Sequence, residues 1–507
     1  MKIKYSVFLA AILLTNAYCS ATEWYVGATR TYTLPSQVRN LVADNDTVYL
    51  DGGVYLNDAT KWTKKNLKFI GLGTGSNRSI LRYSGDISNG KGIFVFESAG
   101  ISDNPYIENI VFDGAQVSDA DGGNGAGIRF QANNITIVNC RFVNCQNGIL
   151  EGNGSVTTSN VTILNSEFEN NGYQLQNDPT HSGYEHHIYI GASTDTLLVQ
   201  NCYFHHPRGQ ANSIKTRAQR SYILYNLIDE GTTGYGSWEL NIAQGGMNVI
   251  MGNIFIQGPA GANHGIIGYD AVTNPLEDFY FVNNTVINQF PGNIKFFNTV
   301  PASGINTFKI YNNIFASVPG ASNTFFSGNT PASLDSAGNV LSTDYTTFGF
   351  TNAATNDYSL TSGATAAIDH GVNAGSTAMA YPLIPVYQYQ SHTSALVPRN
   401  PSGSSIDIGA YEFEFPSTAG IDPEFLSEEI KVYPNPSTGI FHLDFAQLTG
   451  EAGNLEVYDA LGKLVLSSTA VNWSSDYQLD LSVSPNGVYL LKVNDGVKLI
   501  RKTLVIR

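Results

Sequence analysis

"ILNSEF", residues 163–168, holds the pattern that decides the fold: an aliphatic run, an asparagine and a large apolar residue. Similar stretches recur along the chain, and their large apolar residues lie 24 to 36 positions apart. These residues are Phe112, Phe142, Phe168, Phe204, Ile228, Phe255, Val286 and Phe315. Such an interval holds three short strands and three turns, and no segment keeps a 3.6-residue period. The repeat predicts a right-handed parallel β-helix, with coils stacked about 4.8 Å apart.

An asparagine recurs at one turn position of this repeat. It is found at Asn139, Asn165, Asn201, Asn283 and Asn312. Asparagine tolerates the left-handed backbone that a tight turn needs, and like side chains in stacked coils can bond to one another. We expect these asparagines to be structural.

The ends of the stack should be covered, because open sheet edges invite aggregation. Residues 34–55 predict an N-terminal cap, with a short amphipathic helix from Pro35 and Ser36 followed by the first strand. Residues 356–371 and 404–413 predict the closing coils, which end near Phe413. The predicted β-helix domain spans 22–415.

Composition agrees with an all-β chain and limits the partners. Of the 507 residues only 14% are charged, 42% are hydrophobic and 50 are glycine, which suits short strands joined by polar turns. The net charge of −15 argues against a nucleic-acid partner. It leaves room for an anionic substrate at a locally basic cleft. We expect a monomer.

The first 21 residues predict an export signal. Lys2 and Lys4 precede an apolar run over 7–14, and small residues end the segment at 19–21. A lipoprotein signal is the alternative, because Cys19 lies there, but residues 16–18 make a poor lipobox. No other apolar run approaches the length of a membrane span. The three later cysteines are too few for a full disulfide framework, so we expect them to be buried and unpaired.

A linker over 416–429 leads to a segment of different character, residues 430–507. There, alternating strands with Gly and Asn turns predict a small β-sandwich. The motifs "YPNPSTG", "YDALGK" and "PNGVYLLKV" resemble the C-terminal sorting domain of the type IX secretion system of Bacteroidetes. The resemblance implies passage across the outer membrane by that machinery, followed by release or surface attachment.

Aligning the coils places an unusual pair of cations on one strand. In "SIKTR" (213–217) and its equivalents, the second residue is always Ile or Leu and should face the core. Positions one, three and five should then face out. The outward residues of interest are Arg129, His187, Tyr189, Lys215, Arg217, Glu239, Asn241 and Tyr269. His205 and Arg208 add to a basic window over 181–220, with His205 expected at a turn on the substrate rim.

This constellation favours chemistry on a uronic acid polymer. Removing the C5 proton of a uronate requires its carboxylate to be neutralised, a role for Arg217 and Asn241. Lys215 is the predicted base, because the like charge of Arg217 should lower its pKa. His187 is the alternative base, and Tyr189 is a candidate donor to the leaving oxygen. Arg129, Glu239, Tyr269, His205 and Arg208 are the further candidates for substrate binding.

The central region also resembles the β-helical polysaccharide lyases that include alginate lyases and chondroitinase B. "SIKTRAQRSYILYN" and "WELNIAQGGMNVIMGN" are similar to the strands that carry the Lys base and the following Arg in that family. In this chain the family's Lys position falls on Arg217 and its Arg position on Asn241. "DPTH" (178–181) partly matches a signature of mannuronan epimerases.

Several alternatives stay open beside a uronan lyase. These are a C5-epimerase, a glycoside hydrolase using Glu239 with Glu185 or Asp178, and a non-catalytic glycan-binding β-helix. No cofactor is required by the sequence. An oxygen-ligated ion such as Ca²⁺ stays open, although no loop pattern identifies its ligands.

Overall fold

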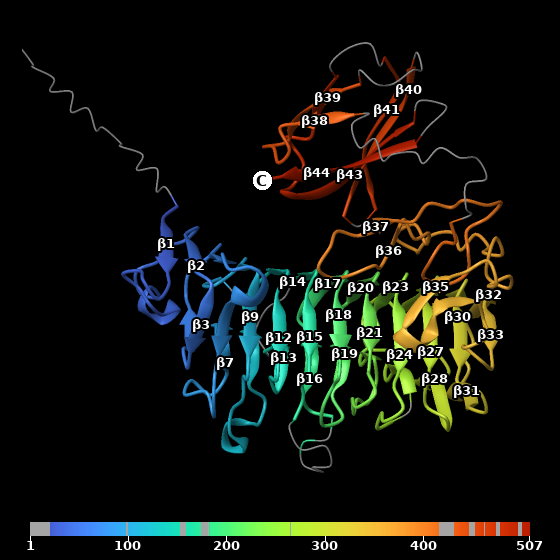
Figure 1. Ribbon diagram of the computed structural model, residues 1–507, viewed down its shortest axis with the longest axis horizontal. Helices are drawn as coiled ribbons and strands as arrows, with labels where there is room; N and C mark the ends of the chain where they lie inside the picture. Colours follow the sequence, from blue (N-terminus) through green and yellow to red (C-terminus); the bar gives the residue numbers. More distant parts are fainter. Residues whose placement is uncertain are drawn as a thin grey trace, which may run out of the picture. The chain divides into compact units, whose positions relative to one another are not determined.

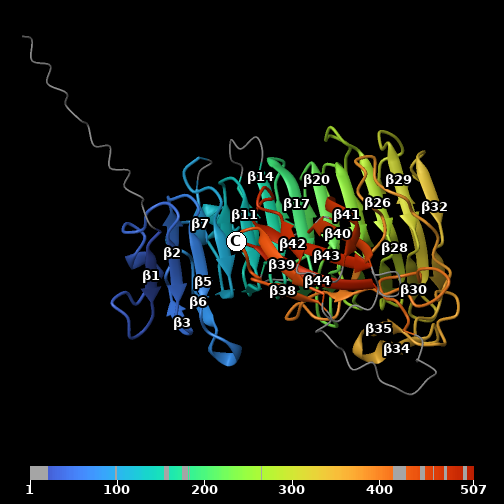
Figure 2. The same ribbon diagram turned by 90° about the horizontal axis from the view of Figure 1, so that it is seen from above.

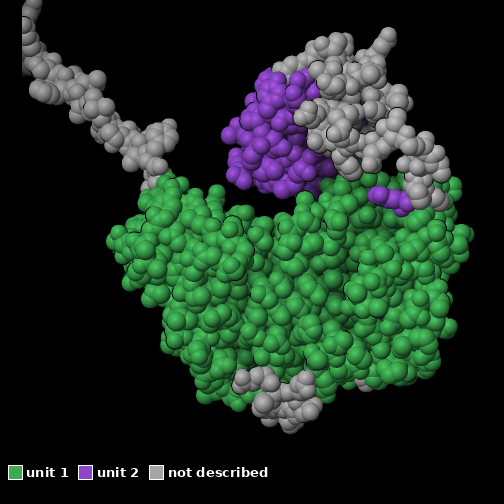
Figure 3. Space-filling model, viewed as in Figure 1, with its two compact units in different colours: residues 1–372, 385–413 green, residues 373–384, 414–507 purple. Residues whose placement is uncertain are grey.

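The computed structural model describes residues 21–97, 100–152, 159–173, 181, 183–263, 265–414, 430–445, 452–460, 462–472, 477–494 and 499–507. Almost all of the expected export signal, the linker over 416–429 and Asp178 lie outside these residues. The chain forms two compact units, which Figure 3 colours separately. One comprises Met1–Val372 with Pro385–Phe413, and the other comprises Asn373–Ile384 with Glu414–Arg507.

Three long parallel sheets build the first unit, and each coil contributes one strand to each sheet. Sheet A has 12 strands: β1 (Glu23–Val26), β2 (Thr47–Leu50), β5 (Lys68–Gly71), β8 (Tyr106–Glu108), β11 (Ile135–Val138), β14 (Ser159–Leu164), β17 (Thr194–Gln200), β20 (Arg220–Leu224), β23 (Met247–Met251), β26 (Asp278–Val282), β29 (Thr307–Tyr311) and β32 (Leu334–Ala337).

Sheet B has 11 strands and follows sheet A in each coil. They are β3 (Gly53–Leu56), β6 (Ser79–Arg82), β9 (Ile110–Asp113), β12 (Arg141–Val143), β15 (Glu167–Glu169), β18 (Tyr203–His205), β21 (Leu227–Asp229), β24 (Ile254–Gln257), β27 (Thr285–Asn288), β30 (Ile314–Ser317) and β33 (Val340–Ser342).

Sheet C has 10 strands and closes each coil. They are β4 (Thr60–Trp62), β7 (Gly92–Phe96), β10 (Ala126–Phe130), β13 (Asn147–Glu151), β16 (His186–Ile190), β19 (Asn212–Thr216), β22 (Leu240–Ile242), β25 (Gly265–Tyr269), β28 (Asn293–Val300) and β31 (Ser322–Gly328). Figures 1 and 2 show the strands of successive coils side by side, as the pairing requires. The predicted parallel β-helix is confirmed, with about 11 turns.

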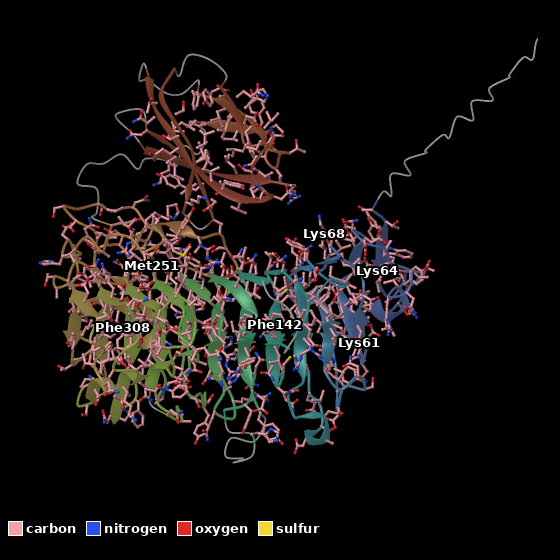
Figure 4. The ribbon with its side chains drawn as sticks, turned by 180° about the vertical axis from the view of Figure 1, so that it is seen from behind. Lys61, Lys64, Lys68, Phe142, Met251 and Phe308 are labelled. Atoms are coloured by element: carbon pink, nitrogen blue, oxygen red, sulfur yellow. The ribbon has the colours of Figure 1, made fainter. Side chains whose placement is uncertain are left out.

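The recurring apolar residue of the repeat forms the centre of the core. Phe142 pairs with Phe168, and Phe168 with Phe204, in register. Their rings stack nearly parallel, with centroids 4.9 Å and 4.6 Å apart. Phe142 and Phe308, both labelled in Figure 4, are buried in the same cluster. Stacking of identical side chains is a direct consequence of a repeat whose register does not slip.

The predicted asparagine turns are confirmed. All five asparagines have φ between 49° and 57°, in the left-handed region. Asn201 donates to Asn165 (2.9 Å) and Asn312 to Asn283 (3.3 Å). The residue after this position forms a second, buried ladder in the later coils. Its members are Asn226, Asn253, Asn284, Asn313 and Asn339.

Both ends of the stack differ from expectation. At the N-terminal end the expected helix is a single 3₁₀ turn, η1 (Pro35–Gln37), because Val38 and Val42 beyond it fill the core from turns. The other 3₁₀ turns are η2 (Gly75–Asn77), η3 (Asp119–Asp121) and η4 (Ala353–Thr355).

At the C-terminal end no further coils stack on β33. Instead β34 (Phe350–Asn352) and β35 (Asp357–Leu360) form an antiparallel pair, and β36 (Tyr387–Gln388) pairs with β37 (Val397–Pro398). Residues 385–413 fold back over the asparagine turns of earlier coils. Asn283 donates to the carbonyl of Asp407, and Asn201 to that of Ser394. The side-chain amides of the asparagine turns need hydrogen-bond partners, and the carbonyls of this segment supply them, which explains why the segment lies there.

The second unit contains two antiparallel sheets around its own core. One joins β38 (Lys431–Tyr433), β39 (Ile440–Asp444) and β42 (Tyr477–Asp480). The other joins β41 (Leu464–Asn472), β40 (Ala452–Asp459), β43 (Gly487–Asn494) and β44 (Leu499–Ile506). No helix among the described residues has the length and apolar character to cross a membrane. Cys140, Cys145 and Cys202 are buried and free.

Candidate functional site

The outer face of sheet C carries the row of side chains predicted from the coil alignment. Arg129 pairs with Leu150, Leu150 with Tyr189, Tyr189 with Lys215 and Lys215 with Asn241. The cross-coil register of these four steps therefore agrees with the alignment. Strand alternation places each of these residues opposite the buried isoleucine or leucine before it.

Two cations converge on one aromatic ring in this row. Nζ of Lys215 lies 5.7 Å from the ring centroid of Tyr189, and Cζ of Arg217 lies 5.3 Å from it. Nε of Arg217 and Nε of Arg129 are buried, and neither has a hydrogen-bond partner among the residues that the structure describes. Within the described part of the chain, none of the three cations forms an ion pair with a carboxylate. We call Arg129, Tyr189, Lys215 and Arg217 the basic patch.

Burial and mutual repulsion tune the ionisation of the basic patch. The pKa of Lys215 is lowered by burial and then by the charge of Arg217. The pKa of Tyr189 is raised, chiefly by burial, so its phenol stays protonated at neutral pH. Burial also lowers the pKa of Arg129, although a guanidinium keeps its charge. An amine with a lowered pKa and a protonated phenol thus lie beside two fixed positive charges.

The structure exchanges the roles expected for two adjacent histidines. His187, expected to face out, is fully buried, and its ring packs at 6.1 Å from the ring of Phe204. Its Nδ1 accepts a hydrogen bond from Nδ2 of Asn171 (2.9 Å). His186, not selected from the sequence, stacks on Tyr189 instead, with centroids 5.7 Å apart. The expectation that His187 lies in the substrate cleft is wrong.

The reason is local geometry at the start of each strand of sheet C. The first and the second position of the aligned stretch both face inward there. A Cβ on Gly127 would lie 2.8 Å from the ring of Phe142, and one on Gly148 would lie 3.0 Å from that of Phe168. Strict alternation holds only from the second position onward, and the residue before the first position, His186, lies on the side of Tyr189 although it is only 1% exposed.

His186 is neutral in this setting. Burial lowers its pKa well below the usual value, and the charges of Lys215 and Arg217 lower it further. Its Nδ1 accepts a hydrogen bond from the backbone N–H of Asn212 (3.2 Å), which leaves the proton on Nε2. Its contact with Tyr189 makes it a neighbour of the basic patch.

Glu239 is also misplaced by simple alternation. It occupies the same first position as His187 and is only 3% exposed. Burial raises its pKa well above the usual value, and the nearby Glu230 raises it further. Its Oε2 has no hydrogen-bond partner. Glu239 is therefore a buried carboxylic acid and not the outward-facing carboxylate that we expected to contact substrate.

The predicted outward position of Tyr269 is wrong, because the coil alignment is shifted by one residue there. Leu240 pairs with Ile267, not Ile266, so Tyr269 pairs with Ile242 and faces the core. It is fully buried, packs on Phe279 and Phe308, and donates a hydrogen bond to Glu277 (3.1 Å). Two adjacent isoleucines in "GIIGY" left the alignment ambiguous. Tyr269 is a core residue.

Beyond Lys215 the outer face of sheet C changes character. Asn241 is fully buried, and its Nδ2 donates to Oδ2 of Asp270 (2.8 Å). Trp238 lies over Gly268, where a Cβ would come within 3.0 Å of the indole. Neither Trp238 nor Asp270 was selected from the sequence. The coil alignment could have found Asp270, which directly follows the aligned strand, whereas the turn residue Trp238 lacked an aligned position.

His205 and Arg208 lie away from the basic patch. His205 ends β18 of sheet B, and its Nε2 lies 3.1 Å from Oε1 of Glu167. It is buried rather than exposed in a turn. Arg208 follows in the turn between sheets B and C, where it lines a separate cavity. Neither of them shares the outer face of sheet C with Lys215.

Among the residues that the structure describes, one group of ligand-type side chains could hold a metal ion: Glu167, Glu169 and His205, whose ligand atoms lie within 4.8 Å of one another. Arg141 already pairs with both carboxylates, at 3.0 Å for Glu167. Nε2 of His392 also lies 3.5 Å from Glu167. Calcium prefers an all-oxygen site, and here an imidazole and a guanidinium take up the carboxylates. The donor set does not fit the calcium site left open by the sequence.

The comparisons with known proteins concern the second unit. Residues 431–507 match the family described as the secretion system C-terminal sorting domain. No curated protein matches the chain. The sorting domain indicates secretion, or attachment at the cell surface, across the outer membrane by the type IX machinery. The protein is thus a parallel β-solenoid joined to a type IX sorting domain.

Proposed function

We propose that this secreted β-solenoid acts on a uronic-acid-containing polysaccharide through its basic patch, as a lyase. One observation supports this most: Lys215 and Arg217 are adjacent, partly buried and without a carboxylate partner among the described residues. Uncompensated buried cations are costly, so they favour an anionic ligand. The outer face of a solenoid sheet also offers an extended surface for a polymer.

In the proposed reaction Arg217 neutralises the carboxylate of the uronate, which makes its C5 proton more acidic. The free amine of Lys215 takes that proton, and the electron pair of the C5–H bond forms the C4–C5 double bond. The C4–O bond breaks, and the phenol of Tyr189 supplies the proton to the leaving oxygen. The lowered pKa of Lys215 and the raised pKa of Tyr189 both suit these roles.

His186 and Arg129 extend the proposed site. His186, neutral and stacked on Tyr189, holds the phenol ring against the two cations. Arg129 lies two coils before Tyr189 in the same row and suits the carboxylate of a neighbouring sugar. If the C5 proton instead returned from the opposite face, the same residues would serve a C5-epimerase.

A second candidate function is glycan binding without turnover. Asn241 stands where the resembled lyases carry an arginine, and its amide is directed to Asp270. A glycoside hydrolase has less support, because Glu239 is buried and hydrolysis needs two carboxyls around the bond.

Incubation of the purified protein with alginate, pectate and glycosaminoglycans tests these candidates. A lyase produces an unsaturated sugar that absorbs in the ultraviolet, and an epimerase changes the proton spectrum of the polymer without shortening it. Binding without either change favours the second candidate. If the protein neither binds nor turns over any uronan, both proposals are contradicted.

A further inference from the structure

A polar cavity lies among the turns that lead from sheet B into sheet C. Its volume is about 280 Å³, and residues of five successive coils line it. Tyr83, Gln116, Asn144, Gln146, Gly172 and Arg208 are among them. These positions lie in turns, outside the outer face of sheet C where the basic patch lies. The cavity is therefore a separate feature of the solenoid.

Arg208 is the one charged side chain among the described residues that line this cavity. Its Nη2 donates to the carbonyl of Gly172 (3.2 Å), and its Nε is buried with no hydrogen-bond partner among the described residues. It forms no ion pair within the described part of the chain. Burial lowers its pKa, yet a guanidinium keeps its proton. The cavity thus holds a desolvated positive charge, and the N–H donors of this guanidinium can bind a ligand.

The nearby acids are already engaged with other groups. Asp113 pairs with Arg82 (2.7 Å) and accepts from Asn144 (3.1 Å). Asp86 accepts a hydrogen bond from Gln116 (3.2 Å). These carboxylates lie beside lining residues and do not neutralise Arg208. An external anion can neutralise the charge of Arg208.

The remaining walls suit a sugar ring. The phenol of Tyr83 and the amide of Gln116 are groups that bond to hydroxyls. The volume lies at the lower end of ligand pockets, which matches a single sugar residue. A guanidinium fork binds a carboxylate or sulfate group through two parallel hydrogen bonds.

We propose that this cavity is a second glycan site, in which Arg208 binds the carboxylate or sulfate group of an acidic saccharide. It would anchor an anionic polysaccharide beside the solenoid independently of any turnover at the basic patch. The inference stands on the cavity and its unpaired cation, not on the lyase proposal.

The test isolates this cavity from the basic patch. Full-length protein with Lys215→Ala and Arg217→Ala together serves as the background, and isothermal titration calorimetry measures binding. The probes are D-glucuronate, inorganic sulfate and methyl glucoside as the neutral control. We expect glucuronate or sulfate to bind in this background at least about tenfold more tightly than the glucoside, because a charged partner strengthens each hydrogen bond.

Adding Arg208→Gln should abolish that binding, and Arg208→Lys should weaken it, since the fork is lost while the charge stays. Gln116→Ala should weaken the binding of glucuronate and leave the binding of sulfate unchanged. This variant tests the sugar-binding wall while Arg208 is intact. Binding of glucuronate alone would assign a uronic acid, and binding of sulfate alone a sulfated sugar. Absence of binding by both anions, equal binding of the glucoside, or binding unaffected by Arg208→Gln would overturn the proposal.

Discussion

At the scale of single residues, two neighbours in one strand have opposite environments. His186 touches the ring of Tyr189, whereas His187 lies against the stacked phenylalanines. Lys215 and Arg217 both lie on the outer face and share one aromatic neighbour. Substitutions at these four positions separate folding from function.

We expect Lys215→Ala and Arg217→Ala each to reduce turnover of the uronan substrate by about a hundredfold or more, because one removes the base and the other the carboxylate partner. Both variants should melt within a few degrees of wild type, since neither side chain is part of the core. Arg217→Lys should not restore the rate, because a lysine cannot form the bidentate fork. Initial rates and thermal melts check this. Full activity of the double variant would refute the assignment of this site.

The histidine pair gives a matched comparison. His187→Ala should destabilise the fold by about 2 kcal/mol or more, because it opens a cavity in the core and removes one of the hydrogen bonds of Asn171. His186→Ala should change stability less and lower the turnover rate. Denaturant unfolding and initial rates measured on both variants test the prediction. The opposite pattern would mean that the strand faces the other way.

At the scale of elements, the coil is the unit of stability. The coils from Phe112 to Phe204 each add one aromatic ring to the central stack, and most coils add one asparagine to a turn row. The turns after sheet B also bury acids, among them Glu230 and Glu239. Packing within a coil and ionisation in its turns can be probed one at a time.

Phe168→Ala should lower the free energy of unfolding by about 3–5 kcal/mol, because the ring stacks on two neighbours and a large cavity is left. Leu341→Ala is the control, since Leu341 is 65% exposed and should change stability by less than about 0.5 kcal/mol. Chemical denaturation of the two variants measures the difference. Equal effects would argue that the aromatic stack is not the main core.

Glu239→Gln should flatten the pH dependence of stability. The folded pKa of Glu239 lies above its unfolded value, so its stabilising contribution is complete below the unfolded pKa and is lost as pH rises through the folded pKa. Glutamine stays neutral and avoids this loss. Melting temperatures over a series from about pH 5 to about pH 9 should fall more in wild type than in the variant. Parallel curves would show that Glu239 does not titrate in this range.

At the scale of the whole molecule, folding and export belong to different units. The solenoid and the sorting domain have separate cores. The family match covers only residues 431–507, so the secretion signal and the proposed chemistry lie in different parts of the chain.

Removal of residues 430–507 should therefore leave a soluble solenoid that keeps its melting transition and its activity but no longer reaches the cell surface. Circular dichroism of the purified truncation and fractionation of cells producing it provide the two measurements. A truncated protein that aggregates would place the boundary elsewhere. One that still reaches the surface would contradict the sorting role.

The repeat made much of the fold predictable from sequence. A large apolar residue such as Phe168 recurs at the same place in successive coils, and an asparagine such as Asn165 marks the same turn in most of them, because stacked coils give equivalent positions equivalent surroundings. The row from Arg129 to Asn241 followed from the same register. The sorting domain followed from local motifs.

Only the tertiary structure decided which residues face out where each strand of sheet C begins. His187 and Glu239 are buried there, although simple alternation from the following Ile or Leu places them outside. The cavity around Arg208 was equally hidden, since it joins turns as distant in sequence as Tyr83 and Arg208. Short-range pattern thus determines the coil and its core, whereas the path of the chain between sheets determines which polar groups meet.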